Sequence, residues 1–242
     1  MTTTTSTSRR SSSSTSPDRA AIHRGDRTVH VRCSNRADGD FHRVDVAFDE
    51  LEARRRSLVD LPWSMLDEHH GVTARLVTHP GEHDGAAGDV LVTELAGVVL
   101  GCWVGDCAPV VLVGAERRIA TAHAGWRGLA AGVLDVAATA LDEAVAEIVL
   151  GPTIGPCCYE FGADDLDAVA EGIGVGRQRL VGRTRSGSDA LDVPAAVEAF
   201  AERIGVRSTR IGGCPGCTYP GFSHRVRRDP QRHVVAVWQE DA

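Results

Sequence analysis

The sequence contains no lysine, and all 26 of its basic residues are arginine. This absence excludes any mechanism that depends on a lysine Schiff base or a lysine general base. Acidic residues outnumber basic ones by 33 to 26, which gives a formal net charge of −7. A negative chain argues against a nucleic acid or an anionic membrane surface as the main partner.

Long hydrophobic runs are missing as well. The best candidate, residues 90–104, is interrupted by Thr93 and Glu94 and is shorter than the roughly 20 residues that a membrane-spanning helix needs. Residues 1–20 are rich in Ser and Thr and contain no hydrophobic segment typical of a secretory signal. We therefore expect a disordered tail over residues 1–20 and a folded catalytic domain over residues 21–242.

The seven cysteines are an odd number in a chain without a recognisable secretory signal, so a disulfide framework is not expected. A reducing, cytoplasmic environment fits this cysteine usage. The length of 242 residues and the hydrophobic content of 43% are sufficient for one sizeable α/β or α+β domain, or for two small ones.

The clearest structural pattern is a β-hairpin. Apolar runs at residues 110–113 and 119–122 flank a short link at residues 114–117 that begins with glycine. Two β-rich runs around such a link are typical of a hairpin. The simplest pairing places Val113 opposite Arg118.

This hairpin brings Cys107 and His123 to its open end, where opposed Cβ atoms lie roughly 5 Å apart. Such a separation suits one metal ion or a thiolate–imidazolium pair. The glycines around Arg127 predict a sharp turn after His123, and the apolar spacing over residues 129–140 predicts a helix. Free N–H groups at the helix start, beside Arg127, would form an anion site; a tight turn with a surface arginine is the alternative.

A second group of candidates lies in the loop at residues 79–83, which follows a predicted strand at residues 73–78. Its proline and glycine indicate a turn at a strand end, a frequent position of functional side chains. His79 and His83 are both candidate ligands there, although a histidine in a loop is more often simply solvated.

The remaining cysteines allow several interpretations. Cys157 and Cys158 are adjacent in the glycine- and proline-rich segment 151–162, so we expect them to point in different directions and not to bind one metal readily. Cys214 and Cys217 form a Cys-x-x-Cys pair. A nearby Pro-Gly argues against a thioredoxin-like helix, and the absence of a second such pair argues against a zinc ribbon.

Four motifs together carry a resemblance. They are Gly105-Asp106-Cys107-Ala108-Pro109-Val110, His123-Ala124-Gly125-Trp126-Arg127-Gly128, residues 151–162, and Cys217-Thr218 followed by Phe222-Ser223-His224-Arg225. Over residues 72–238 the sequence resembles the bacterial YfiH-like family, long labelled multicopper polyphenol oxidase or laccase domain. The family is now described as purine nucleoside phosphorylase with adenosine deaminase and methylthioadenosine phosphorylase activities. The resemblance implies a single α/β (α+β) domain with mixed β-sheets flanked by helices.

The resemblance also implies a metal site formed by His79, Cys107 and His123, with His83 as an alternative for the first ligand. The family's first histidine sits in Gln-Val-His-Gly, and the corresponding segment is taken as residues 77–81. Three protein ligands with an open fourth position are typical of catalytic zinc. Zinc is therefore the expected cofactor, with copper as the alternative.

The implied activity is that of a zinc-dependent purine nucleoside enzyme. It would deaminate adenosine to inosine, with zinc activating the attacking water and Asp106 as a candidate proton shuttle. It would also cleave adenosine, inosine or methylthioadenosine with phosphate. Arg127, Gly125, Cys158 and Tyr159 are expected to contact the nucleoside and the phosphate. We expect a monomer or a small homo-oligomer without nucleic-acid or membrane partners.

Three other functions are weighed against this one. Cys107 as a nucleophile with His123 as its base would give a hydrolase acting on cell-wall peptide precursors. A domain that kept the fold and only binds a partner is also conceivable. Multicopper oxidation is disfavoured, because it needs many histidine ligands and the chain has ten histidines in all, without His-x-His pairs.

Overall fold

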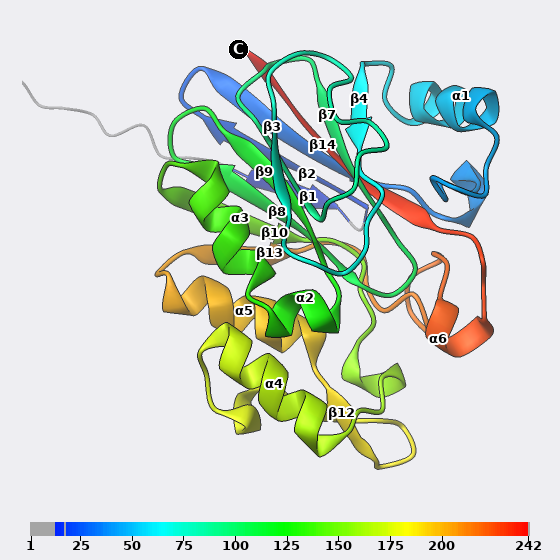
Figure 1. Ribbon diagram of the computed structural model, residues 1–242, viewed down its shortest axis with the longest axis vertical. Coiled ribbons are helices and arrows are strands. Elements are labelled where there is room, and N and C mark those ends of the chain that lie inside the picture. Colours follow the sequence, from blue (N-terminus) through cyan, green and yellow to red (C-terminus); the bar gives the residue numbers. More distant parts are fainter. Residues whose placement is uncertain (1–12, 17, 242) are drawn as a thin grey trace, which may run out of the picture.

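Two six-stranded mixed sheets pack face to face in the computed structural model, which describes residues 13–16 and 18–241 (Figure 1). The first sheet has the order β1-β2-β3-β14-β7-β4, and only its edge strand β4 pairs in parallel. Its strands are β1 (Ser13–Ser16), β2 (Arg19–Arg24), β3 (Arg27–Cys33), β14 (His233–Asp241), β7 (Val99–Val104) and β4 (Trp63–Met65).

The second sheet has the order β13-β10-β8-β9-β6-β5, with parallel pairs at its two edges and antiparallel pairs at its centre. Its strands are β13 (Arg207–Arg210), β10 (Val145–Leu150), β8 (Ala108–Gly114), β9 (Ile119–Ala124), β6 (Val90–Thr93) and β5 (Ala74–Val77). Every residue of β8 and β9 is buried. Strands covered on both faces require such nearly continuous apolar sequences.

Helices cover the outer faces of both sheets (Figure 1). Helix α1 (Phe48–Leu58) packs on the first sheet through Leu51 and Leu58. Helices α3 (Val133–Leu141) and α5 (Val193–Arg203) pack on the second sheet, and α2 (Trp126–Ala130) packs against α4 (Ala163–Ile173). The remaining elements are α6 (His224–Arg227), the hairpin of β11 (Val181–Arg183) and β12 (Asp189–Leu191), and the 3₁₀ turns η1 (Arg36–Asp38), η2 (Pro156–Cys158) and η3 (Arg177–Arg179).

Three apolar layers hold this arrangement together. Residues of β3, β14, β8 and β10 fill the space between the two sheets, and the other two layers lie under α1 and under α3 and α5. The predicted single domain with mixed sheets flanked by helices is therefore confirmed.

The predicted hairpin is present, but its register differs by one residue from the prediction. Val113 pairs with Ile119 rather than with Arg118. The turn is wider because one carboxylate holds it: Glu143 accepts backbone N–H groups at 3.0–3.2 Å from Glu116, Arg117 and Arg118. Extending the observed register by one residue puts Cys107 opposite Gly125. Since side chains alternate along a strand, Cys107 and His123 then share one face.

The helix predicted after His123 is divided into α2 and α3. Gly132 separates them in the left-handed region, with φ of 81°. A glycine adopts this conformation without steric cost. The break allows α3 to lie across β9 and β6.

The predicted tail at residues 1–20 falls partly outside the described residues, namely at 1–12 and 17. Its C-terminal part differs from the prediction, because Ser13–Ser16 form β1 and Arg19 begins β2. Ala20 is buried in the layer between the sheets. Antiparallel pairing with β2 provides hydrogen-bond partners for backbone groups of this polar segment. The amino-acid composition does not reveal such pairing.

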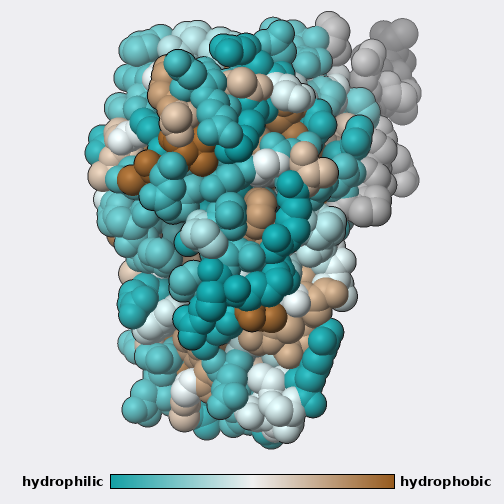
Figure 2. Space-filling view, turned by 90° about the vertical axis from the view of Figure 1, so that its right-hand side faces the viewer, coloured by the Kyte–Doolittle hydropathy of each residue, from teal (hydrophilic) through white to brown (hydrophobic). Residues whose placement is uncertain are grey.

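Among the described residues, no helix combines the length and the apolar character that crossing a bilayer requires. The face that carries α1 and α6 is mostly hydrophilic, with hydrophobic atoms in small separate areas (Figure 2).

The turn contacts of Glu143 lead to a prediction on stability. Replacing Glu143 by Ala removes the acceptor of three backbone N–H groups, so we expect a loss of about 1–2 kcal/mol, or a fall in Tm of roughly 2–8 °C for a chain of this size. Thermal unfolding measured by circular dichroism checks this value. Glu116→Ala, an exposed change in the same turn, is the control and should leave Tm unchanged; equal Tm values for the two variants would contradict the role of Glu143.

Candidate metal site and pocket

The open end of the hairpin forms the floor of a cavity of about 410 Å³. Its lining comes from the ends of β7 and β9, from the loop between β7 and β8, from α2 and α6, and from the loops before α1, β5 and β14 and after β10. This size is typical of small-molecule sites. The cavity therefore receives side chains from both sheets and from the helices α2 and α6.

Three potential metal ligands converge on this floor. One ligand atom from each of His70, Cys107 and His123 lies within 4.8 Å of the other two. The Cys107 Sγ is 3.7 Å from the His70 Nε2, and the rings of His70 and His123 are 4.8 Å apart between centroids. One thiolate and two imidazoles suit Zn²⁺, and copper also accepts this donor set.

A buried carboxylate, that of Asp89, organises two of these ligands. It accepts the backbone N–H groups of His69, His70 and Gly71 at 3.2, 2.8 and 2.8 Å. It also accepts a hydrogen bond from the His123 Nδ1 at 3.0 Å. This bond leaves the His123 Nε2 to face Cys107, the arrangement by which carboxylates orient metal-binding histidines.

The same groups shift one another's proton affinity. Burial raises the pKa of the Cys107 thiol, but the charge and hydrogen bonds of His123 and His70 outweigh it and lower the pKa to about 6. Burial lowers the pKa of His123, yet the charges of Glu68 and Cys107 raise it well above its usual range. The floor of the pocket therefore favours a thiolate beside an imidazolium in the absence of a cation.

Glu68 is a second buried carboxyl group in the pocket, 3.8 Å from the His123 Nδ1. Burial raises its pKa to about 8, although the charge of His123 opposes the shift. Its Oε1 accepts the backbone N–H of Trp103 at 3.1 Å. The pKa values of Glu68 and His123 are therefore linked, because the charge of each group shifts the pKa of the other.

The structure does not bring the predicted first ligand to the site. His79 is exposed and lies 3.7 Å from Glu82, and His83 contacts the same carboxylate at 3.6 Å. Both belong to the loop after β5, at the opposite end of that strand from His70. His79 and His83 therefore lie away from Cys107 and His123, and His70 is the histidine that the structure places beside these two residues.

Asp106 lines the pocket, but both of its carboxylate oxygens already accept hydrogen bonds. The Ser223 hydroxyl and the Arg225 backbone N–H donate to them at 2.7 Å each. This pairing connects the floor of the pocket to the start of α6. Its role as a proton shuttle remains a prediction.

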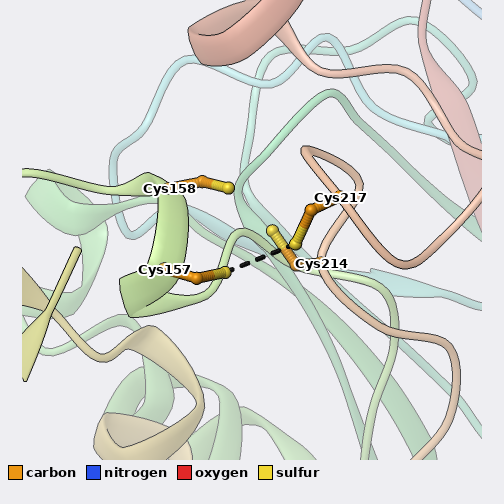
Figure 3. A group of neighbouring side chains, drawn as sticks. All are labelled: Cys157, Cys158, Cys214 and Cys217. Carbon is orange, nitrogen blue, oxygen red and sulfur yellow. Dashed lines mark hydrogen bonds between the residues drawn. The ribbon is translucent and has the colours of Figure 1, made fainter. Parts of the chain in front are cut away.

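The other predicted contact residues divide into two groups. Arg127 and Tyr159 line the pocket, and the Arg127 guanidinium lies over the Trp126 ring at 4.5 Å. Gly125 adjoins the ligands, since a Cβ there would lie 2.6 Å from a His70 ring carbon. Cys158 instead faces three other cysteines (Figure 3).

One signal in the sequence could have identified His70. The dipeptide His70-Gly71 matches the end of the Gln-Val-His-Gly pattern better than His79-Pro80 does, because the glycine directly follows the histidine. Glu68 and Asp89 carry no comparable signal, since their roles depend on partners far along the chain.

Comparison with known proteins supports the resemblance. Residues 22–240 match the family described as multi-copper polyphenol oxidoreductase laccase. A purine nucleoside phosphorylase of Streptomyces coelicolor is 32% identical over 210 residues, which cover 83% of this chain and 84% of that protein. One of Xylella fastidiosa is 36% identical over 157 residues, and the match spans 62% of this chain and 60% of the relative's length.

Two further similarities concern activity and fold. A protein named adenosine deaminase RL5, from an unidentified prokaryote, is 29% identical over 143 residues, 55% of each chain. The crystal structure of the Bacillus licheniformis hypothetical protein YfiH superposes with a TM-score of 0.75 at 20% identity, covering 92% of this chain and 97% of that one. This likeness shows the shared fold.

The lowered pKa of Cys107 predicts its reactivity in protein stripped of metal. Below pH 6 the thiol is protonated and unreactive, and above pH 6 it is a thiolate, so alkylation by iodoacetamide should rise with a midpoint near pH 6. Peptide mapping by mass spectrometry isolates the rate at Cys107. His123→Ala should move the midpoint upward, beyond the ordinary thiol value of about 8.5. A midpoint near that ordinary value in the unaltered chain would refute the ion pair.

Proposed function

Since this chain belongs to the multi-copper polyphenol oxidoreductase laccase family, and its relatives include purine nucleoside phosphorylases and an adenosine deaminase, we propose that it is a metal-dependent purine nucleoside enzyme. It deaminates adenosine to inosine and cleaves adenosine, inosine or methylthioadenosine with phosphate to the base and a ribose 1-phosphate. Its metal is zinc.

The observation that carries this proposal is the convergence of His70, Cys107 and His123 on the floor of a cavity that could hold a nucleoside. Trp103, Trp126 and Tyr159 line the walls and offer flat apolar surfaces to a purine. Basic side chains also line the cavity, namely those of His42, Arg127, His224, Arg225 and Arg232. A polar floor, aromatic walls and a basic rim match a substrate with a base, a sugar and an anionic partner.

The family's older label is not supported by the ligands at hand. Within residues 13–16 and 18–241, two side-chain groups could hold a metal ion: this His/Cys/His set and a set of four cysteines. Multicopper oxidation needs several copper ions with histidine-rich ligand sets. A single open three-ligand site fits hydrolytic chemistry better.

The proposed roles follow from the contacts. His70, Cys107 and His123 would hold the zinc ion, which would lower the pKa of a water molecule towards ~7 and so supply a nucleophile at neutral pH. Asp89 fixes the loop of His70 and the ring of His123. Glu68 lies in the pocket 3.8 Å from the His123 Nδ1 and is the candidate group to donate a proton to the departing amine at C6 of adenosine.

Phosphorolysis needs an anion held beside the C1′ atom of the ribose. Arg127 is exposed at the pocket edge, with its guanidinium over the Trp126 ring. Arg225 is placed over the Tyr159 ring at 4.8 Å. A guanidinium group can donate two parallel hydrogen bonds to two oxygens of one phosphate. Arg127 and Arg225 therefore form the phosphate-binding side of the pocket in this proposal.

The first test asks which histidine binds the metal in the pocket, by comparing the metal content of three alanine variants. His70→Ala should lose the pocket metal because it removes one of three ligands, whereas His79→Ala and His83→Ala should retain it. Elemental analysis of the purified variants, together with adenosine deamination, measures both effects. We expect activity of His70→Ala to fall at least about 10–100-fold, the range seen for even an outer partner of a metal ligand.

The same measurement distinguishes the proposed function from the alternative one, a cysteine hydrolase. If the unaltered chain carries no metal at Cys107 and still hydrolyses peptide precursors of the cell wall, the cysteine-hydrolase hypothesis replaces this proposal. Loss of metal in His79→Ala but not in His70→Ala would restore the earlier ligand assignment.

The second test concerns Arg127. Removing its guanidinium deletes a charge-assisted contact with phosphate worth about 1.5–3 kcal/mol, so phosphorolysis should fall roughly 10–100-fold, mainly through weaker phosphate binding. Deamination uses water and should fall much less. Arg56→Ala, an exposed change on α1, is the matched control and should alter neither rate. Equal loss of both activities with the metal retained would show that Arg127 holds the nucleoside or the scaffold.

A further inference from the structure

A second group of potential metal ligands lies outside the pocket. The Sγ atoms of Cys157, Cys158, Cys214 and Cys217 all lie within 4.8 Å of one another. Figure 3 shows the first two on the turn η2 and the other two on the loop between β13 and α6, with the two pairs facing each other across one space. We propose that these four cysteines bind a structural Zn²⁺ ion.

The spacing of the sulfur atoms fits this ion. Four sulfurs at 2.3 Å from a tetrahedral zinc are about 3.8 Å apart. The Cys157 Sγ and the Cys217 Sγ are 3.4 Å apart, and the widest pair in the group reaches no more than 4.8 Å. These separations lie around the tetrahedral value. They are well beyond the roughly 2.05 Å of a disulfide bond.

The adjacent pair contributes two ligands, contrary to what its spacing in the sequence suggests. Cys157 and Cys158 lie on a 3₁₀ turn, in which successive side chains diverge by about 120°. Figure 3 shows both of their side chains directed toward the loop of Cys214 and Cys217. Adjacent positions in the sequence therefore do not keep the two sulfur atoms from lying within 4.8 Å of each other and of the other two.

The backbone of the Cys-x-x-Cys segment is preorganised for this role. The Cys214 carbonyl accepts N–H groups from Cys217, Thr218 and Tyr219 at 3.0, 2.8 and 3.0 Å. This turn directs both cysteine side chains to the same side. A Cβ at Gly216 would lie 3.1 Å from the Cys158 Sγ and 2.7 Å from a Val226 methyl carbon, so only glycine lets the turn approach η2 this closely.

The exposure of the four cysteines and the chemistry of their thiols both allow zinc to bind. Cys214 is buried, whereas Cys157, Cys158 and Cys217 are partly exposed. Zinc can therefore enter from solvent, and the thiols lose their protons to water as the sulfur–zinc bonds form. Thiolates are the ligands of closed structural zinc sites, which need no open position.

The proposed ion joins the two segments that build one wall of the pocket. Cys158 directly precedes Tyr159, and the loop of Cys214 and Cys217 leads into α6 with Arg225. Arg225 lies over the Tyr159 ring at 4.8 Å, and its N–H binds Asp106. Zinc at the four cysteines would fix this wall without touching the substrate.

The test uses the full chain with the pocket ligand removed, so that it does not depend on the proposed function. Purified Cys107→Ala, prepared without a metal-chelating tag, should retain about one zinc per chain, bound at the four-cysteine site. X-ray absorption at the zinc edge should show a shell of sulfur alone at about 2.3 Å.

Adding Cys214→Ser and Cys217→Ser to Cys107→Ala should remove that zinc and lower Tm, whereas adding Cys33→Ala, a core cysteine elsewhere, should retain it. The absorption measurement keeps the test valid if the serine variant fails to fold. A Cys107→Ala protein without zinc, a shell containing nitrogen or oxygen, or a mass lower by two hydrogens from a Cys157–Cys217 disulfide would each overturn the proposal.

Discussion

The contacts of the Asp89 carboxylate are the interaction on which the candidate site depends. This group lies at the start of β6 and is buried. Burial alone raises its pKa, but hydrogen bonds and the charge of His123 lower the pKa below its ordinary value. An ionised carboxylate here binds three consecutive backbone N–H groups around His70 and the ring of His123. Since an unpaired buried charge is strongly unfavourable, the loop and the strand must stay together.

This constraint explains why the site lies at the open end of the hairpin. The hairpin of β8 and β9 lies at the centre of the second sheet, and Trp103 from β7 of the first sheet and Glu68 line the same pocket. The end of a strand is held by a rigid sheet, while the side chains just beyond it can point in various directions. Reactive groups can therefore converge there without lying in the hydrophobic core. A pocket built at such a junction receives its ligands from segments that are distant in sequence.

The opposite wall of the pocket is held in a different way. Asp106 connects the floor to Ser223 and Arg225, and the four cysteines bring η2 beside the loop that enters α6. These segments contain little regular secondary structure, so few backbone hydrogen bonds of helices or sheets hold them in place. With the proposed zinc, the wall would gain the rigidity that binding a substrate requires.

Sequence alone determined those features that depend on neighbours along the chain. Alternating apolar runs and a glycine-containing link fixed the hairpin, and with it the approach of Cys107 and His123. The motifs identified the family and the mixed-sheet fold. The hairpin register was missed by one residue, because Glu143 from another segment holds the turn.

Only the tertiary structure brought His70 beside Cys107 and His123, and only it assembled the buried carboxyl groups and the four cysteines. His70 is 37 residues from Cys107 in sequence, and Cys157 is 60 residues from Cys217. No periodicity relates positions so far apart. Whether they meet is set by strand order and by buried charges such as Asp89, which acquire their partners only when the sheets have packed.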